Sequence, residues 1–260
     1  MRTALTIAGS DSGGGAGIQA DLKTFAAHGV YGASAITAVT AQNTVGVSTW
    51  TAMSIDLVVA QIEAVVADIG ADAVKTGMLP SAGIVTAVAE AAKRFSLNRL
   101  VVDPVMIAKS GDRLIDTDAI EAFRSVLIPV TFLLTPNIPE AEALTGLRIQ
   151  DAESRREAAR RLVSLGASAV AIKGGHLPSS DIVDLLYDGT RFLEFTAERV
   201  ASQNTHGTGC TFAAAMAAHL ALGHELEDAI PEVQRYIAGA IRNAPMLGRG
   251  HGPMDHFWQT

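Results

Sequence analysis

The chain has 260 residues, of which 48% are apolar and 18% are charged, so it can bury a sizeable core and is not intrinsically disordered. Its 20 Lys and Arg residues against 27 Asp and Glu residues give a net charge of −7, and basic residues gather nowhere, which argues against a nucleic-acid-binding surface and against an anionic membrane as partner. The single cysteine excludes a disulfide within the chain. The N-terminal apolar stretch is too short for a secretory signal and no segment is long enough to span a bilayer, so we expect a cytoplasmic protein.

Short β-rich runs alternate with longer segments of helical periodicity along the whole chain. In chain order the pattern predicts a strand over residues 4–8, a helix over 18–27, a strand over 33–40, a helix over 55–69, a strand over 73–75, a helix over 84–95, a strand over 100–102, a helix over 118–127, a strand over 132–134, helices over 141–145 and 153–165, a strand over 169–172, and helices over 212–222 and 225–243. This alternation is typical of an α/β fold with a mainly parallel sheet covered by helices on both faces.

One segment departs from the alternation. An Asp-Gly pair, Asp188 and Gly189, lies between two apolar runs within residues 184–195 and predicts an antiparallel hairpin, which we place at one edge of the sheet. No linker, composition break or internal repeat interrupts the chain. We therefore expect one domain over residues 1–260.

The first of two glycine clusters, residues 9–17, follows a predicted strand and opens a helix. Its last part, residues 15–20, matches the G-x-G-x-x-A form of the dinucleotide fingerprint, but no acidic residue occurs between Asp21 and Asp56. This disfavours a nicotinamide or flavin site, and the absence of a Walker pattern disfavours a P-loop NTPase. Tight packing of strand on helix would explain one or two glycines better than five in nine residues, so we expect a ligand to approach this backbone closely.

The second cluster, residues 204–211, precedes an apolar helix. The backbone N–H groups of residues 207–210 are predicted to point at one spot, where the helix dipole favours an anion. Cys210 would lie in this first turn, where the pKa of a thiol is expected to be lowered. The alternative interpretation is that Cys210 has no functional role and is simply a small buried residue where the loop and the helix pack closely. We favour the functional interpretation.

Polar residues end three further predicted strands, at the edge where open α/β sheets bind ligands. Asp103 ends one of them, and Lys173 emerges beside two glycines from another. Asn137 and Glu140, after a third, fit a helix capping box and also a metal–phosphate role, and one does not exclude the other. Two carboxylates, one lysine and an anion hole at one edge indicate phosphoryl transfer with a divalent cation, Mg²⁺. His251 and His256 lack the spacing of a zinc site, and we interpret them as structural or exposed.

Several long motifs together resemble the hydroxymethylpyrimidine/phosphomethylpyrimidine kinases of thiamine biosynthesis, within the ribokinase-like superfamily. They are residues 8–23, 40–43, 75–79, 103–112, 134–142, 173–176, 204–211 and 250–253. The resemblance runs nearly end to end. It implies a three-layer α/β/α fold with a mainly parallel central sheet, an edge hairpin in the C-terminal half, and a homodimer.

The resemblance also implies ATP-dependent phosphorylation of 4-amino-5-hydroxymethyl-2-methylpyrimidine to its monophosphate and then to the diphosphate. The pyrimidine would be bound by Gly9, Asp21, Gln42, Met78 and Val105. The nucleotide would be bound by Asn137, Glu140, Lys173, Thr205, Gly207 and Thr208, with Asp103 and Glu140 near Mg²⁺. The catalytic groups would be Lys173, Gly207, Gly209 and Cys210.

Three questions stay open at this point. Sugar kinases of the superfamily usually carry an Asp base where this chain has Cys210, so the identity of a base is unsettled, and a loose transition state can proceed with a weak base or none. The loop over residues 108–112 could close over ATP. The alternatives to the pyrimidine kinase are a pyridoxal or pyridoxine kinase and a non-catalytic pyrimidine-binding regulatory protein.

Overall fold

The computed structural model describes residues 1–106, 117–175 and 181–259. Within these residues the centre of the molecule is an eight-stranded sheet with the order β10-β9-β8-β7-β6-β5-β1-β2. Its strands are β1 (Thr3–Ala8), β2 (Tyr31–Ile36), β5 (Ala73–Thr76), β6 (Leu100–Val102), β7 (Leu133–Leu134), β8 (Ala169–Ile172), β9 (Asp181–Tyr187) and β10 (Phe192–Glu198). Strands β2, β1, β5, β6, β7 and β8 are parallel to one another, and β9 is antiparallel to both β8 and β10.

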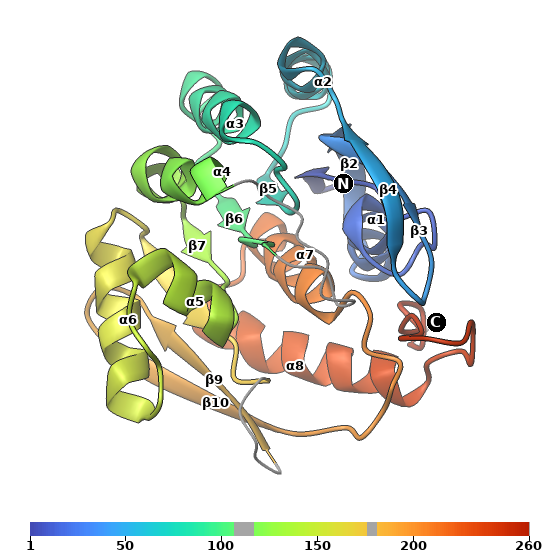
Figure 1. The fold of residues 1–260 in the computed structure, drawn as a ribbon, viewed down its shortest axis with the longest axis vertical. Coiled ribbons are helices and arrows are strands. Elements are labelled where there is room, and N and C mark those ends of the chain that lie inside the picture. Colours follow the sequence, from blue (N-terminus) through green and yellow to red (C-terminus); the bar gives the residue numbers. More distant parts are fainter. Residues whose placement is uncertain (107–116, 176–180, 260) are drawn as a thin grey trace.

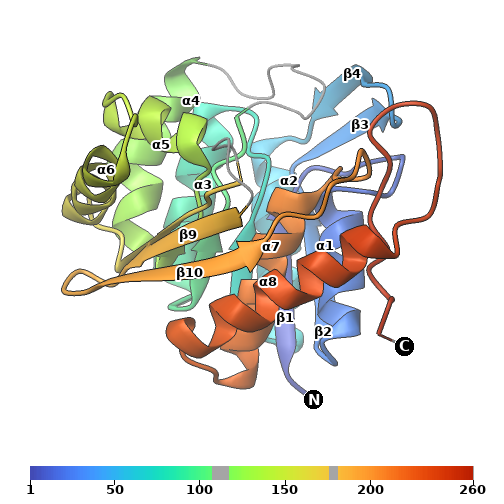
Figure 2. The same cartoon turned by 90° about the horizontal axis from the view of Figure 1, so that it is seen from below.

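Helices cover both faces of this sheet (Figure 1). One face carries α2 (Ile55–Asp68), α3 (Ala82–Arg94), α4 (Thr117–Ala122), α5 (Ile138–Thr145) and α6 (Ala152–Ser164); the other carries α1 (Gly17–Ala27), α7 (Thr208–Leu222) and α8 (Leu226–Arg242). On this second face α7 packs against both α1 and α8 (Figure 2). The strands supply both cores by alternation: Leu5 and Ile7 of β1 belong to one apolar cluster, and Ala4 belongs to the other.

The three-layer α/β/α arrangement with a mainly parallel sheet is therefore confirmed, as is the edge hairpin. Asp188 builds the turn of that hairpin, because its Oδ1 accepts the backbone N–H groups of Thr190 and Arg191 at 2.9 and 2.7 Å. These bonds hold the pKa of Asp188 well below its usual range. Gly189 takes φ +89°, a conformation that favours glycine. No helix among the described residues is both long and apolar enough to cross a membrane.

The predicted strand over residues 33–40 is wrong in one respect, because the chain divides there into two strands. β2 ends at Ile36, and β3 (Ala38–Gln42) leaves the main sheet to pair with β4 (Val47–Ala52) in a separate two-stranded sheet. The break is at Thr37, whose N–H donates to the Ala8 carbonyl and whose Oγ1 donates to the Met78 carbonyl at 2.6 Å. This turns β3 towards the end of β1.

The other differences are at the ends of elements. α7 begins at Thr208 rather than at residue 212, and α5 begins at Ile138 rather than at residue 141. The helix expected over residues 118–127 is α4 followed by a π-helical turn, Phe123–Leu127, and a 3₁₀ turn, Ile128–Val130. The earlier starts of α5 and α7 matter for function, because each brings a predicted site residue into a first helical turn.

Candidate active site

A cleft of about 680 Å³ opens where β1, β5, β6, β7 and β8 end. Residues that follow these strands line it together with the first turn of α7, as expected for ligand binding at the carboxyl edge of a parallel sheet. The predicted site residues that line it are Gly9, Gln42, Met78, Asp103, Val105, Asn137, Glu140, Lys173, Thr205, Gly207, Thr208, Gly209 and Cys210. The loop over residues 108–112 and His176 lie outside the described residues.

Asp21 is the predicted site residue that the structure does not bring to the cleft. It lies inside the protein on α1, where its Oδ1 and Oδ2 accept hydrogen bonds of 2.9 and 2.8 Å from Lys75 Nζ. Thr6 Oγ1 donates to Oδ2 at 2.6 Å, and both charged side chains are fully buried. The carboxylate expected to bind the pyrimidine is thus occupied by partners within the protein, and it is Lys75 that lines the cleft.

Lys75 brings a positive charge to the floor of the cleft. Burial alone would lower its pKa, but the surrounding negative groups, Asp21 first among them, together outweigh burial and raise the pKa, so the side chain is a cation at neutral pH. Lys75 was missed at the sequence level. Lys75 lies near the end of the short buried strand β5, and Lys173 directly follows the short buried strand β8. A lysine at the end of a buried apolar run is the signal that could have found Lys75.

The expected charged groups meet at the ends of β6, β7 and β8. Lys173 Nζ donates to Asp103 Oδ1 at 2.9 Å. Asn137 and Glu140 form the predicted capping box of α5, with Glu140 N–H donating to Asn137 Oδ1 at 2.9 Å and Asn137 N–H donating to Glu140 Oε2 at 2.8 Å. Burial raises the pKa of Glu140 to about 7, because the attraction of Lys173 offsets it only in part and Asp103 adds negative charge. Two buried carboxylates therefore share one lysine.

The two glycine clusters meet at the N-terminus of α7. Gly207 is the N-cap, with φ +83°, and no side chain caps the helix. Its Cα lies so close to the Gly15 carbonyl that a Cβ at this position would collide with that oxygen. Glycine at position 207 thus meets two separate demands, the positive φ and the close approach of the first cluster. Gly207, Thr208, Gly209 and Cys210 all line the cleft, which is where the anion-hole prediction places them.

Cys210 lies in this first turn, as predicted, but the expected lowering of its pKa is wrong. Burial raises the pKa of Cys210 to about 11. The attraction of Lys75 and a hydrogen bond from the Gly17 backbone offset only part of that effect. The thiol is therefore protonated at neutral pH.

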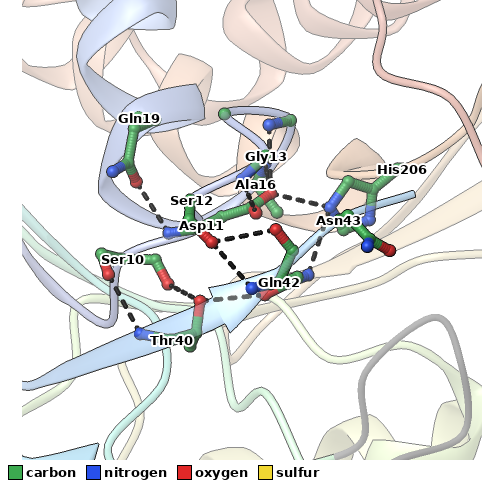
Figure 3. A network of polar contacts seen from close by, with 12 residues as sticks. Ser10, Asp11, Ser12, Gly13, Ala16, Gln19, Thr40, Gln42, Asn43 and His206 are labelled. Atoms are coloured by element: carbon green, nitrogen blue, oxygen red, sulfur yellow. Dashed lines mark hydrogen bonds and ion pairs between the residues drawn. The ribbon is translucent and has the colours of Figure 1, made fainter. Parts of the chain in front are cut away.

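Asp11 organises the first glycine cluster (Figure 3). It is buried, its Oδ1 accepts the N–H of Gly13 at 2.8 Å, and its Oδ2 accepts the N–H groups of Gly15 and Ala16 at 3.0 and 2.8 Å. His206, directly before the N-cap of α7, places its Nε2 2.8 Å from the same Oδ2. The sequence analysis did not identify Asp11 or His206 as site residues, although Asp11 belongs to the first glycine cluster and His206 to the second.

A further part of the cleft runs between the β9–β10 hairpin and α8. Asp184 accepts the N–H of Gly174 on Oδ1 and the Gln234 amide on Oδ2, each at 2.8 Å, and so fixes the backbone next to Lys173. Beyond it the lining is mainly apolar, with Ile182, Ala197, Val200, Ile237, Ala238 and Ile241. Nothing in the sequence pattern indicated this part of the cleft, because its residues come from a hairpin and a helix that meet only in the fold.

The chain as a whole is similar to known proteins. A family model described as phosphomethylpyrimidine kinase matches residues 11–255. The chain is 49% identical to the hydroxymethylpyrimidine/phosphomethylpyrimidine kinase of Bacillus subtilis over 255 residues, which cover 98% of this chain and 94% of that protein. It is 55% identical over 253 residues to the thiamine biosynthesis bifunctional protein ThiED of Geobacter sulfurreducens, where the match covers 97% of this chain and 52% of the relative, about half its length.

Among solved structures, the pyridoxal kinase from Staphylococcus aureus in complex with ADP is similar over 100% of this chain and 94% of that one, with a TM-score of 0.92 and 37% identity. The fold, the cleft and the relatives agree on one class of enzyme. The chain is a kinase and belongs to the phosphomethylpyrimidine kinase family.

Proposed function

We propose that this chain transfers the γ-phosphoryl group of ATP to the hydroxymethyl oxygen of 4-amino-5-hydroxymethyl-2-methylpyrimidine, and then a second phosphoryl group to the monophosphate. The observation that carries the proposal is a single cleft with two unlike ends that meet at the first turn of α7. Relatives named for both kinase activities support it.

The acceptor end lies beside the first glycine cluster. Gln42 offers an amide, which can both donate to and accept from an aminopyrimidine. Met78 and Val105 line the same wall with apolar side chains that can pack against the ring. Gly9 leaves room there, because a Cβ on it would lie 3.1 Å from the Met78 sulfur.

The nucleotide end lies over β7, β8 and the β9–β10 hairpin. Lys173 and the N–H groups of residues 207–210 would bind phosphate oxygens, with Thr205 and Thr208 beside them. The mainly apolar part between β9–β10 and α8 has a lining suited to a purine base. ATP as the donor is also supported by the ADP bound to the Staphylococcus aureus relative.

The donor set fits Mg²⁺. Asp103 and Glu140 are buried carboxylates in the cleft, and the raised pKa of Glu140 shows that burial and the neighbouring negative charge are incompletely compensated there. Mg²⁺ takes hard oxygen ligands, usually one or two carboxylates together with phosphate oxygens and water. When bound, the ion would neutralise charge on the phosphates of ATP. Asp103 and Glu140 would hold it, and Asn137 would keep Glu140 in place through the capping box.

The two steps both need charge stabilisation on the transferred group, but they differ in whether the acceptor must lose a proton. In both, Lys173 and the N–H groups of Gly209 and Cys210 would stabilise charge on the transferred group. In the first step the hydroxymethyl oxygen also loses a proton, whereas in the second the acceptor is a phosphate oxygen that is already ionised. A group that removes a proton therefore matters in the first step alone.

The experiment is product identification. The chain is incubated with ATP, Mg²⁺ and hydroxymethylpyrimidine, and the products are identified by ³¹P NMR and mass spectrometry. We expect the monophosphate first and the diphosphate later. Lys173→Met should strongly slow the appearance of both products, while Lys93→Met, at an exposed lysine at the end of α3, should leave it unchanged. ATP consumption without a pyrimidine phosphate would refute the proposal.

Pyridoxal phosphorylation is a second candidate, favoured by the close structural similarity to a pyridoxal kinase. Pyridoxal also carries a hydroxymethyl group on an aromatic ring, so it could use the same cleft. The same experiment with pyridoxal in place of the pyrimidine tests it.

We also propose a cytoplasmic homodimer built from one domain per chain. The resemblance to this family supports the dimer, and the continuous sheet, with strands from Thr3–Ala8 to Phe192–Glu198, supports the single domain. Light scattering after size exclusion would give the mass of the assembly, and a monomer at micromolar concentration would contradict the dimer.

A further inference from the structure

A chain of polar contacts on the cleft wall joins three side chains from distant parts of the sequence (Figure 3). Asp11 comes from the first glycine cluster, Gln42 from the end of β3, and His206 from the loop before α7, and all three line the cleft. His206 Nε2 lies 2.8 Å from Asp11 Oδ2 and 3.3 Å from Gln42 Nε2. The donor and acceptor roles along this chain can be worked out from the remaining contacts.

Asp11 determines where the proton of His206 lies. Its Oδ1 accepts one backbone N–H and its Oδ2 accepts two, from Gly15 and Ala16, so both oxygens act as acceptors and the side chain is a carboxylate. A carboxylate oxygen facing an imidazole nitrogen at 2.8 Å requires the proton to be on that nitrogen. His206 therefore presents an Nε2–H.

Thr40 determines whether the Gln42 amide meets a donor or an acceptor on the side away from His206. Its Oγ1 lies 2.8 Å from the Ser10 carbonyl, which accepts the only proton of this hydroxyl. Towards the Gln42 amide, 3.4 Å away, Thr40 thus offers a lone pair. The backbone of Gln42 is fixed by Ser12, whose Oγ accepts its N–H at 2.7 Å and donates to its carbonyl at 2.9 Å.

The two ends of an amide have nearly the same shape, so the surrounding donors and acceptors decide its orientation. On the His206 side of Gln42, Nε2 carries a proton that is donated to Asp11 at 2.8 Å, so this nitrogen has no lone pair to accept an amide N–H and can share its proton only weakly with an oxygen 3.3 Å away. On the Thr40 side stands an acceptor. We infer that His206, with its proton held by Asp11, is a positioning residue for the acceptor substrate: it turns the Gln42 amide so that Oε1 faces His206 and Nε2 faces Thr40. The inference rests on the proposed function, because it concerns the same acceptor site.

This orientation has a consequence for substrate choice. One N–H and one oxygen lone pair of Gln42 remain for the cleft, in a fixed order. An aminopyrimidine carries an N–H donor and a ring nitrogen acceptor on adjacent atoms and can engage both. In pyridoxal the ring nitrogen and the hydroxyl are not adjacent, so one amide can engage only one of them. A fixed amide therefore favours the aminopyrimidine.

The test is a double-mutant cycle in the full chain, with the KM of the acceptor as readout. His206→Leu removes the protonated ring nitrogen that excludes the amide N–H from this side, and we expect the KM of hydroxymethylpyrimidine to rise about fivefold, with kcat and the KM of ATP within about twofold of wild type. His206→Gln keeps an N–H near the position of Nε2 and should restore most of the loss. In a Gln42→Ala background, His206→Leu should have no further effect. His251→Leu, at an exposed histidine with its Nδ1 3.4 Å from the Gln203 carbonyl, is the matched control.

Two results would overturn the inference. The first is an equal rise of the acceptor KM on His206→Leu with and without Gln42, which would show that His206 acts on the loop in general. The second needs no substrate: ¹⁵N NMR of the free protein at pH 7, with His206 assigned from the variant, should show a protonated Nε2, and a neutral ring protonated on Nδ1 would contradict the assignment. Failure of the proposed function would instead appear in the wild-type chain, as no turnover of the pyrimidine.

Discussion

The thiol of Cys210 lies close to a buried ammonium and a helix N-terminus, yet burial raises its pKa to about 11. Below that value the thiolate fraction rises about tenfold with each pH unit. Of the two proposed steps, only the first takes a proton from an alcohol. If the thiolate accepts that proton, the two steps must depend differently on pH and on Cys210.

We expect Cys210→Ala to lower kcat of the first step on the order of 10²-fold, and that of the second step by less than about threefold. In the wild-type chain kcat of the first step should rise between pH 7 and pH 9, and the rise should be absent in the variant. Rapid-quench assays with hydroxymethylpyrimidine and with its monophosphate measure the two steps separately. Equal losses in both would rule out this role for Cys210.

Lys173 should matter equally in both steps, because the transferred phosphoryl group carries the same charge in each. We expect Lys173→Met to reduce kcat/KM on the order of 10²- to 10³-fold with either acceptor. The variant also leaves Asp103 without its partner at 2.9 Å, so thermal unfolding should be recorded alongside the kinetics. A loss confined to one step would show that the lysine contacts the acceptor rather than the donor phosphates.

At this scale the sequence predicted which residues line the cleft better than it predicted their ionisation. Residues at strand ends and in glycine clusters could be selected from the local pattern, and Asp103, Glu140 and Lys173 were found in this way. The acidity of Cys210 depends on how deeply the fold buries it, which the local pattern does not contain. The Asp11–His206 contact joins positions 195 residues apart and could not be seen before the fold was known.

At the scale of elements, one buried ion pair holds α1 to β5. Lys75 and Asp21 are both fully buried, and they are joined by two hydrogen bonds. Removal of one charge leaves the other without a partner in the core, which costs about 3–5 kcal/mol. Replacement of both by apolar residues of similar volume costs much less, because no charge is then left buried.

We therefore expect Asp21→Leu to lower the free energy of unfolding by about 3–5 kcal/mol, and Asp21→Leu combined with Lys75→Met to recover most of that loss. Urea titrations followed by circular dichroism measure both. The double variant also separates the role of Asp21 in stability from a role in acceptor binding. If Asp21 supports binding of the pyrimidine by holding Lys75 in place, the double variant should be stable but should bind the acceptor weakly. A double variant as unstable as the single one would contradict the account.

The elements themselves were largely predictable. Continuous apolar runs marked β6 and β8 at their observed bounds, because strands buried on both faces need no polar alternation. β4 was missed, since nearly all of its residues are exposed and its pattern carries no core signal. The break at Thr37 was missed because its cause is a pair of hydrogen bonds to Ala8, at the end of β1, and to Met78, in the loop after β5.

At the scale of the whole molecule, buried histidines tie stability to pH. Burial lowers the pKa of His219 and of His256 to about 4, with nearby histidines contributing at His219 and Lys23 at His256. The unfolded chain has histidine pKa values near 6.5, so between pH 6.5 and pH 4 it binds more protons than the folded chain. Stability therefore falls as the pH falls through this window.

We expect each of these two histidines to remove up to about 3 kcal/mol of stability once the pH is below 4. Urea unfolding at a series of pH values should show the loss as one transition if residues 1–260 form a single domain. His256→Gln should flatten the slope, whereas His251→Gln, at an exposed site, should not. An unchanged slope in His256→Gln would place the acid sensitivity elsewhere.

The central claim is that this cleft phosphorylates a hydroxymethylpyrimidine and then its monophosphate. The measurement that tests it most directly is ADP release, coupled to NADH oxidation, with hydroxymethylpyrimidine, its monophosphate, pyridoxal and pyridoxine compared under the same conditions. The account predicts turnover with both pyrimidines, at a kcat/KM above that of either vitamin B6 form. Turnover with pyridoxal or pyridoxine alone, or with none of the four, would contradict it.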